Sequence, residues 1–189
     1  MNYTSIESIK KKVSSCTKCE LCENRTNSVP GKGNINSKVI FVGEAPGRSE
    51  DKRGEPFVGS AGKKLSLALE DAGITRDSVY ITNIVKCRPP NNRVPTIEER
   101  KKCSSYLESE ISLIKPKIIC VMGNTAFKSL LGGENITKHR GKIIKKDNQD
   151  YFVTIHPAAT IYNQELFPIL KQDMKKLVKI ITENSHDTT

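Results

Sequence analysis

The sequence predicts an α/β domain in three layers, in which a central, mainly parallel sheet of four strands lies between two layers of helices. Short β-branched or aliphatic segments alternate along the chain with longer segments whose apolar residues recur at helical spacing. The chain has 189 residues, of which 36% are hydrophobic, so one domain with a packed core is expected. We place that domain at residues 1–182 and expect a polar, frayed tail at 183–189.

In the first half of the chain, two predicted strands enclose one helix. Lys38-Val-Ile-Phe-Val42 is apolar after its lysine and ends at a glycine, which is typical of a buried strand. Apolar residues recur at helical spacing over 61–72, and Gly73 follows as a C-cap. The β-branched run 79–85 predicts the second strand. The prolines that follow it enforce a loop.

Helices and strands continue to alternate in the second half. Thr96-Ile-Glu-Glu99 is a capping box, which predicts a helix from there to about Lys115. The remaining elements are expected as a strand over 117–122, a helix over 124–131, a pair of strands over 141–146 and 151–155, and a helix over 166–182.

Charge and hydropathy narrow the function classes. The formal net charge of +10 favours a polyanionic partner, most simply a nucleic acid, because lysine and arginine release counterions from phosphates. A basic surface also serves solubility, so charge alone decides little. No apolar run of about 18 residues is present and the N-terminus has no signal-peptide core, which excludes a membrane span. We therefore expect a cytoplasmic protein whose thiols are reduced or metal-bound.

The cysteines fit a metal site better than a disulfide framework. Four candidate ligands form a close pair and a widely spaced pair: Cys16, Cys19, Cys87 and Cys103. Thiolates bind zinc or iron–sulfur clusters, and for these four we favour ligation over simple burial. Cys120 lies inside an apolar strand, where burial is the better reading. Cys22 is ambiguous, because it makes a second C-x2-C pair with Cys19.

Three unusual loops follow predicted strands, at the edge of a parallel sheet where ligand crevices form. They are Gly43-Glu-Ala-Pro-Gly47, Lys86-Cys-Arg-Pro-Pro90 and His156-Pro-Ala-Ala159. Asn83 interrupts an apolar strand, and its amide can donate and accept hydrogen bonds, as reading a base edge requires. Phe57 lies among Gly and Pro residues, where it is either a core residue or a surface on which a base stacks. His156 is either structural or a hydrogen-bond donor to a developing oxyanion.

Taken together, these segments resemble the family 4 uracil-DNA glycosylases, the thermostable iron–sulfur branch of the uracil-DNA glycosylase superfamily. The matching motifs are Cys16-x2-Cys19 with Arg25-Thr-Asn27, Gly43-Glu-Ala-Pro-Gly47, Pro56-Phe-Val-Gly59 with Ala61-Gly62, Asn83, Cys87-Arg-Pro-Pro-Asn-Asn-Arg93, Cys103 and His156-Pro-Ala-Ala159. Each motif is short, but their order and spacing together are highly specific.

The resemblance implies a DNA repair enzyme with a [4Fe–4S] cluster on the four candidate cysteines. It would flip uracil out of double- or single-stranded DNA, hydrolyse the N-glycosidic bond and release free uracil. The implied base-binding residues are Gly43, Glu44 and Ala45 through their backbone, Glu50 against the C5 edge, Phe57 by stacking, Asn83 at the Watson–Crick edge and His156 at O2. Ile161 is the implied wedge in the duplex, and Arg88 and Arg93 would meet phosphate.

The resemblance also implies a mechanism. Family 1 enzymes carry a water-activating aspartate where Ala45 stands here, so a dissociative reaction is expected, with Glu44 or Asn83 positioning the water. The catalytic residues would then be His156, Asn83 and Glu44. We expect a monomer. Two alternatives stay open: a non-enzymatic, redox-responsive iron–sulfur protein that binds nucleic acid, and a superfamily glycosylase for another base such as hypoxanthine or xanthine.

Overall fold

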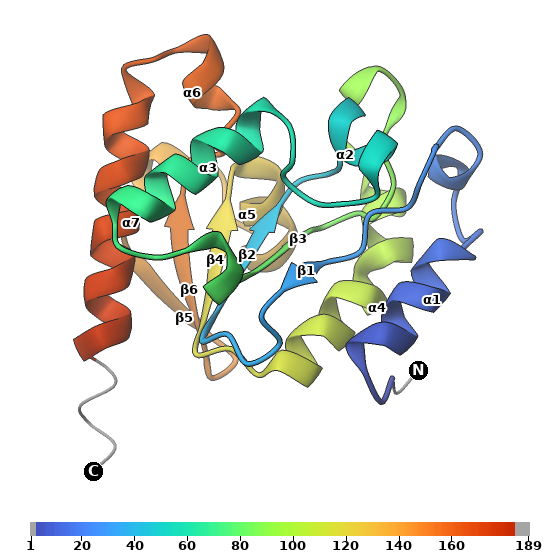
Figure 1. Ribbon diagram of the computed structural model, residues 1–189, viewed down its shortest axis with the longest axis horizontal. Helices are drawn as coiled ribbons and strands as arrows, with labels where there is room; N and C mark the ends of the chain where they lie inside the picture. The colour runs from blue at the N-terminus through green and yellow to red at the C-terminus, as the bar shows by residue number, and fades with distance from the viewer. Residues whose placement is uncertain (1–2, 184–189) are drawn as a thin grey trace.

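A six-stranded sheet forms the centre of the computed structural model, which describes residues 3–183 (Figure 1). The strands are β1 (Lys32–Gly33), β2 (Val39–Gly43), β3 (Tyr80–Asn83), β4 (Ile118–Met122), β5 (Ile143–Lys146) and β6 (Gln149–Thr154). Their order in the sheet is β1-β3-β2-β4-β6-β5, with β3, β2, β4 and β6 parallel to one another and an antiparallel strand at each edge. The prediction of a mainly parallel sheet is confirmed.

The sheet has two strands more than the predicted four. The four parallel strands are the four principal predicted ones, and β5 is the segment expected to pair with the last of them. β1 was not predicted, because two residues, one of them glycine, carry no hydrophobic alternation. Both additions lie at the sheet edges, where they leave the parallel centre unchanged.

Within residues 3–183, seven α-helices surround the sheet. They are α1 (Ile6–Ser14), α2 (Arg48–Arg53), α3 (Ser60–Asp71), α4 (Ile97–Ile114), α5 (Asn124–Leu131), α6 (Ala159–Tyr162) and α7 (Leu166–Glu183). The expected capping box is present, since the Thr96 side chain accepts from the Glu99 N–H and the Glu99 carboxylate accepts from the Thr96 N–H. α7 runs through Glu183, and the rest of the expected tail lies outside the described residues.

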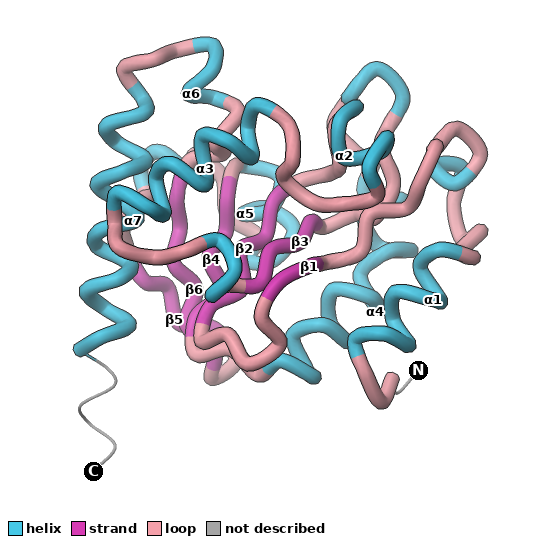
Figure 2. The backbone as a smooth tube through the Cα atoms, in the orientation of Figure 1, coloured by secondary structure: helices cyan, strands magenta, loops and turns pink. Residues whose placement is uncertain are grey.

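The layers follow from the alternation of side chains along each strand. Ile40 and Val42 of β2 face a core shared with α1, α4 and α5, whereas Val39 and Phe41 face a core shared with α3 and α7. Figures 1 and 2 show the same arrangement, with α3 and α7 in front of the sheet and α5 behind it. α1 was not predicted; only three of its residues are buried, in an otherwise polar, lysine-rich segment.

The carboxyl ends of the parallel strands all lie at the upper edge of the sheet, where the loops gather (Figure 2). This edge therefore brings together segments that are far apart in the sequence. Among residues 3–183, no helix combines the length and the apolar character that crossing a membrane requires.

Candidate active site

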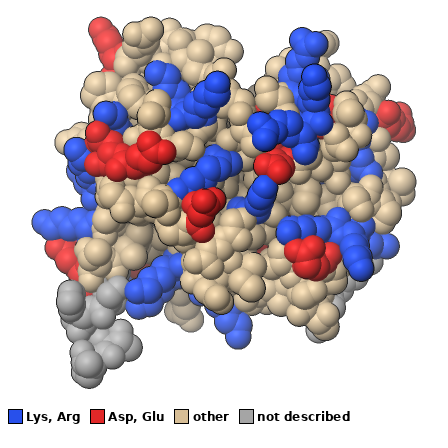
Figure 3. Space-filling model, in the orientation of Figure 1, with Lys and Arg blue, Asp and Glu red and all other residues tan. Residues whose placement is uncertain are grey.

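A cavity of about 540 Å³ lies at the carboxyl edge of the sheet. It is bordered on one side by Gly47, Glu50, Asn92 and Val94, and on the other by Ala158 and Tyr162. In the space-filling view a notch separates the lobe of α6 from the lobe of α2, with Lys and Arg side chains on both lobes (Figure 3). Six residues predicted to bind substrate line this one cavity: Glu44, Ala45, Glu50, Phe57, Asn83 and His156.

Asn83 ends β3 and is only 1% exposed. Its side-chain oxygen Oδ1 is buried and has no hydrogen-bond partner among the described residues. Gly43, the seventh predicted binding residue, lies beside it: a Cβ there would be 2.6 Å from Asn83 Oδ1 and 2.6 Å from Phe57 Cζ. A buried acceptor without a partner costs about 1–3 kcal/mol, so its place in the cavity indicates a ligand that donates a hydrogen bond.

Phe57 and His156 supply aromatic surface to the cavity, with ring centroids 5.7 Å apart and planes inclined by 33°. Phe57 has φ = 53°, a left-handed conformation that is rare for an aromatic residue. A Cβ at Gly62 would lie 1.7 Å from the Phe57 carbonyl oxygen, so only glycine lets α3 pack this closely against the Phe57 backbone.

His156 is held as a neutral hydrogen-bond donor. Burial lowers its pKa to about 4, although the negative charge of Glu50 acts in the opposite direction. Its Nδ1 atom accepts a hydrogen bond of 3.1 Å from the Ala158 N–H. In the neutral imidazole the other ring nitrogen then carries the proton, so Nε2–H is the available donor.

The two glutamates of the cavity, Glu50 and Glu44, accept hydrogen bonds from different parts of the chain. The Glu50 carboxylate accepts from the backbone N–H groups of Gly47 (3.1 Å), Val58 (2.9 Å) and Gly59 (2.7 Å), so it ties the first loop to the segment that carries Phe57. The Glu44 carboxylate accepts a hydrogen bond from Thr125 Oγ1 at the start of α5. Thr125 was not predicted from the sequence as a residue of this site, although Gly123-Asn-Thr125 directly follows a predicted strand and marks a fourth loop at this edge.

The rim of the cavity differs from expectation in two places. Ile161 is 40% exposed but does not line the cavity, whereas its neighbour Tyr162 lines it and is 90% exposed. The guanidinium of Arg93 makes a two-pronged ion pair with Glu99, with distances of 2.8 and 2.6 Å. Arg88 is half-buried and donates to Asn92 Oδ1 on the same loop, whereas the Arg93 side chain stays 42% exposed despite its ion pair. Tyr162 is thus the exposed side chain on this side of the rim.

The four candidate metal ligands come together around one small cavity beside α1, α4 and the loop after β3. Cys22 lines it as well. Cys120 lies in β4 with 0% exposure, which confirms the prediction that it is a buried strand residue. Among residues 3–183, no three His, Cys, Asp or Glu side chains converge closely enough to hold a single metal ion.

Two side chains next to the cysteines, Arg25 and Tyr106, carry hydrogen-bond donors that a metal-bound sulfur atom can accept. Arg25 Nη1 donates to Cys87 Sγ over 3.1 Å, and the buried Tyr106 side chain lines the cysteine cavity next to Cys16. Burial raises the pKa of the Cys103 thiol to about 12, against the opposing influence of Lys86. A metal would have to displace these protons, which makes loading dependent on pH.

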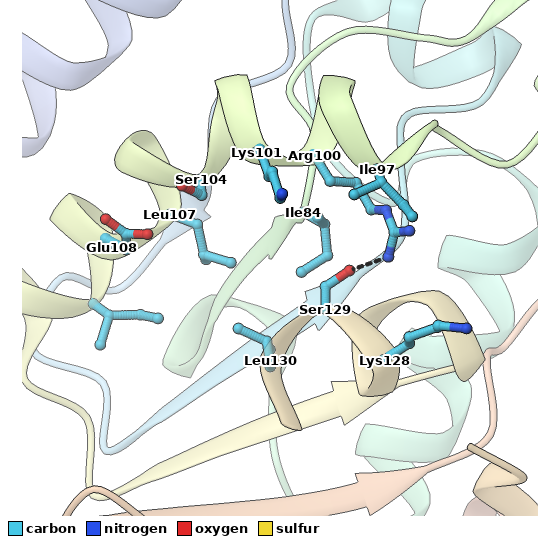
Figure 4. Close-up of a pocket in the computed structure, with 11 residues that line it drawn as sticks. Ile84, Ile97, Arg100, Lys101, Ser104, Leu107, Glu108, Lys128, Ser129 and Leu130 are labelled. Carbon is cyan, nitrogen blue, oxygen red and sulfur yellow. Dashed lines mark hydrogen bonds between the residues drawn. The ribbon is translucent and has the colours of Figure 1, made fainter. Parts of the chain in front are cut away.

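A second cavity, of about 410 Å³, lies between α4 and α5 (Figure 4). Ile84, Leu107 and Leu130 point into it, and a hydrogen bond of 2.8 Å from Arg100 to Ser129 crosses its mouth. None of the base-binding or metal-ligand residues predicted from the sequence lines this cavity. The candidate active site is therefore the cavity at the sheet edge.

Fold and cavity together define a class: an α/β protein with a cavity at the carboxyl edge of a parallel sheet, lined by a phenylalanine ring, an imidazole and a buried amide. Comparison with known families agrees, since the model of the uracil DNA glycosylase superfamily matches residues 30–181. Type-4 uracil-DNA glycosylases are among the similar proteins. That of Sulfurisphaera tokodaii is 49% identical over 92% of this chain and 83% of its own length. That of Archaeoglobus fulgidus is 42% identical over 92% of both chains, and that of Thermotoga maritima 43% identical over 93% and 94%.

This protein belongs to the type-4 family of the uracil-DNA glycosylase superfamily. The resemblance expected from the cysteine pair and the ordered loop motifs is thereby confirmed.

Proposed function

We propose that this protein is a monofunctional uracil-DNA glycosylase, a DNA repair hydrolase that removes uracil from DNA and leaves an abasic site. The observation that carries the proposal is the partnerless Asn83 Oδ1 at the base of a cavity walled by Phe57 and His156. We further propose that it acts as a monomeric single domain on double- and single-stranded DNA. It releases free uracil.

The cavity suits uracil through complementary edges. Uracil N3–H donates to Asn83 Oδ1, and the amide group of Asn83 donates in return to uracil O4. The ring stacks on Phe57, whose position is fixed by Gly43 and Gly62. We assign to Glu50 the exclusion of the thymine methyl group, acting together with the loop that its carboxylate holds.

Departure of the base is the step that the protein assists most. As the glycosidic bond lengthens, negative charge collects on uracil O2 and the sugar becomes oxocarbenium-like. The Nε2–H of neutral His156 donates to O2, while Asn83 holds the opposite edge. One such donor aimed at developing charge contributes about 3–4 kcal/mol to the rate.

Water then completes the reaction at the sugar. Ala45 provides no carboxylate, so we assign the positioning of the water to Glu44, which Thr125 orients. A cation-like sugar needs little activation of its nucleophile, so a positioned carboxylate suffices. The uracil anion leaves and is protonated by solvent.

We propose that the thiolates of Cys16, Cys19, Cys87 and Cys103 would hold a [4Fe–4S] cluster. The arrangement of these thiols around one cavity and the Arg25 donor support this donor set. When bound, the cluster supplies structural cross-linking between the N-terminal segment, the loop after β3 and α4. Catalysis remains with residues that bind no metal.

The proposal is tested by uracil release from oligonucleotides, detected as strand cleavage after alkaline treatment. We expect cleavage of uracil-containing single and double strands and none of thymine-containing duplexes. A parallel series with hypoxanthine and xanthine identifies a shifted base specificity. Folded, iron-loaded protein that releases no uracil would refute the proposal, and DNA binding without release would instead favour the non-enzymatic alternative.

The lowered pKa of His156 gives an expected pH profile. Because the imidazole stays neutral down to about pH 4, kcat/KM should show no ionisation near 6.5 and should fall only as the pH approaches 4. Protonation there adds a hydrogen to Nδ1 and breaks its bond from Ala158. An inflection of kcat/KM near pH 6.5 that disappears in His156→Gln would contradict this assignment.

The same pKa predicts how stability depends on pH. The unfolded chain binds a proton near pH 6.5, whereas folded His156 binds one only near pH 4. The contribution of neutral His156 to the free energy of unfolding is therefore complete above about pH 6.5 and is lost as the pH falls towards 4. We expect wild-type protein to lose stability relative to His156→Gln across this window in denaturant titrations.

A further inference from the structure

A buried ion pair lies directly behind the cavity, on the side of the sheet that faces α4. The Lys86 side chain is 1% exposed and the Glu110 side chain 0% exposed, and their Nζ–Oε2 distance is 2.7 Å. Glu110 comes from α4 and Lys86 from the loop that follows β3. Neither residue contacts the cavity, and the proposed chemistry uses neither.

Every donor of the Lys86 ammonium group is used. Besides Glu110, Nζ donates to Thr82 Oγ1 at 2.5 Å and to the Asn83 carbonyl oxygen at 3.0 Å. Thr82 Oγ1 donates in turn to Glu110 Oε2 at 2.8 Å. The Glu110 Oε1 atom accepts from the Gly31 N–H at 2.9 Å. The network is saturated, so its geometry is closely determined.

Stability alone does not account for this pair. Replacing a buried ion pair with apolar residues of similar volume is often neutral or stabilising, because burial removes both charges from water. An apolar pair, however, cannot make directional hydrogen bonds to the backbone. Lys86 fixes the backbone carbonyl of Asn83 at the last residue of β3, where the regular ladder ends.

We infer that Lys86, held by Glu110, is the positioning residue that orients Asn83 for reading the base. The inference rests on the proposed function, because it concerns the residue assigned to the uracil edge. Lys86 also borders the metal-ligand set, since its backbone N–H donates to Cys103 and it precedes Cys87. The pair thus joins the cysteine centre to the base-reading amide.

The test removes both charges together, in Lys86→Met/Glu110→Leu, so that no unpaired charge is left buried. We expect single-turnover release of uracil to slow by about 10- to 100-fold, the effect of a misplacement near 1 Å. Affinity for free uracil, measured by calorimetry, should weaken by a comparable factor. Affinity for abasic DNA should stay within about 2-fold, because abasic DNA presents no base to Asn83.

A matched control exists on the opposite face of the sheet. Arg140 and Asp173 form a second ion pair, in which the Asp173 side chain is 0% exposed and also accepts from Thr154 Oγ1 at 2.8 Å. We expect Arg140→Met/Asp173→Leu to change thermal stability at least as much and to keep the rate within about 3-fold of wild type. Iron content and absorbance at about 400 nm verify equal loading of all proteins.

If the Met/Leu protein does not fold, Lys86→Gln/Glu110→Gln and Lys86→Leu/Glu110→Gln replace it, since they differ by one amide donor. The Gln/Gln protein should release uracil at least about 10-fold faster than the Leu/Gln protein. The inference is overturned by a wild-type rate in the Met/Leu protein, by an equal loss in the Arg140/Asp173 control, or by equal rates in the two glutamine variants. Inactive wild-type protein would instead refute the proposed function.

Discussion

Asn83→Ala is expected to slow uracil release by a factor of about 10³ without unfolding the protein. The substitution removes both the acceptor for uracil N3–H and the donor for O4, so two base-edge contacts are lost with one side chain. Its effect on stability should be small or favourable, because the Oδ1 atom that it deletes is buried and has no partner among the described residues. Lost activity with retained stability is the signature of a residue kept for its ligand.

Single-turnover rates on a uracil-containing single strand measure this effect without interference from product release. Melting temperature and affinity for abasic DNA serve as internal controls, and both should remain near the wild-type values. Asn83→Asp separates the two contacts, because it keeps an acceptor and loses the amide donor. Uracil release by Asn83→Ala within about 10-fold of wild type would remove the assigned role.

The sequence was most informative where a local rule was broken. Asn83 could be selected because it interrupts an apolar strand, and the parallel sheet then places it beside the loops that follow β2 and β6. Phe57 and Gly43 were found through their loop motifs. Their mutual contact, however, depends on the positive φ of Phe57, which no residue pattern predicts. The sheet edge, in short, was predictable from alternation of elements, and the contacts within it were not.

The missed features share one cause, which is that they depend on partners far away in the sequence. From the sequence alone, Glu110 would be expected on the solvated face of its helix. In the folded chain it is buried and hydrogen-bonds Lys86, Thr82 and Gly31. Arg93 stays a predicted phosphate contact with an exposed side chain, and its ion pair with Glu99, itself expected only as a cap, was not predicted. Tyr162 ends α6, a helix of four residues that is too short to show a hydrophobic period.

Buried carboxylates recur as the groups that hold the loops of the site. Glu50 fixes the segments of Gly47 and Phe57, and Asp51 Oδ1 accepts from the Thr26 N–H. Glu110 anchors the end of β3 through Lys86. Each acid bonds backbone or a basic group on another segment, so loops that have no regular ladder of their own acquire fixed positions. That rigidity suits a site whose selectivity depends on the placement of a few polar atoms.

Two buried cysteines provide the sharpest test of the proposed cluster. Cys103 is 8% exposed and lines the cysteine cavity, whereas Cys120 is 0% exposed within β4 and lies apart from it. We expect Cys103→Ala to lose iron and the absorbance at about 400 nm, and to melt about 10 °C lower, because it removes a cross-link between α4 and the loop after β3. Cys120→Ala deletes the same atoms from a purely apolar setting and should keep the iron content and the colour.

The measurements are iron and sulfide content, visible absorbance and thermal melting of anaerobically purified proteins. Cys22→Ala belongs in the same series, because Cys22 lines the cavity and the sequence left its role open. If Cys22 is not a ligand, that variant keeps its iron as Cys120→Ala does; if it replaces Cys16 or Cys19, the corresponding single variants exchange their effects. A colourless protein with stoichiometric zinc would refute the cluster, and unchanged iron in Cys103→Ala would remove Cys103 from the ligand set. Because loading is verified separately from activity, a loss of uracil release in Cys103→Ala can then be assigned to a displaced Asn83 rather than to missing chemistry.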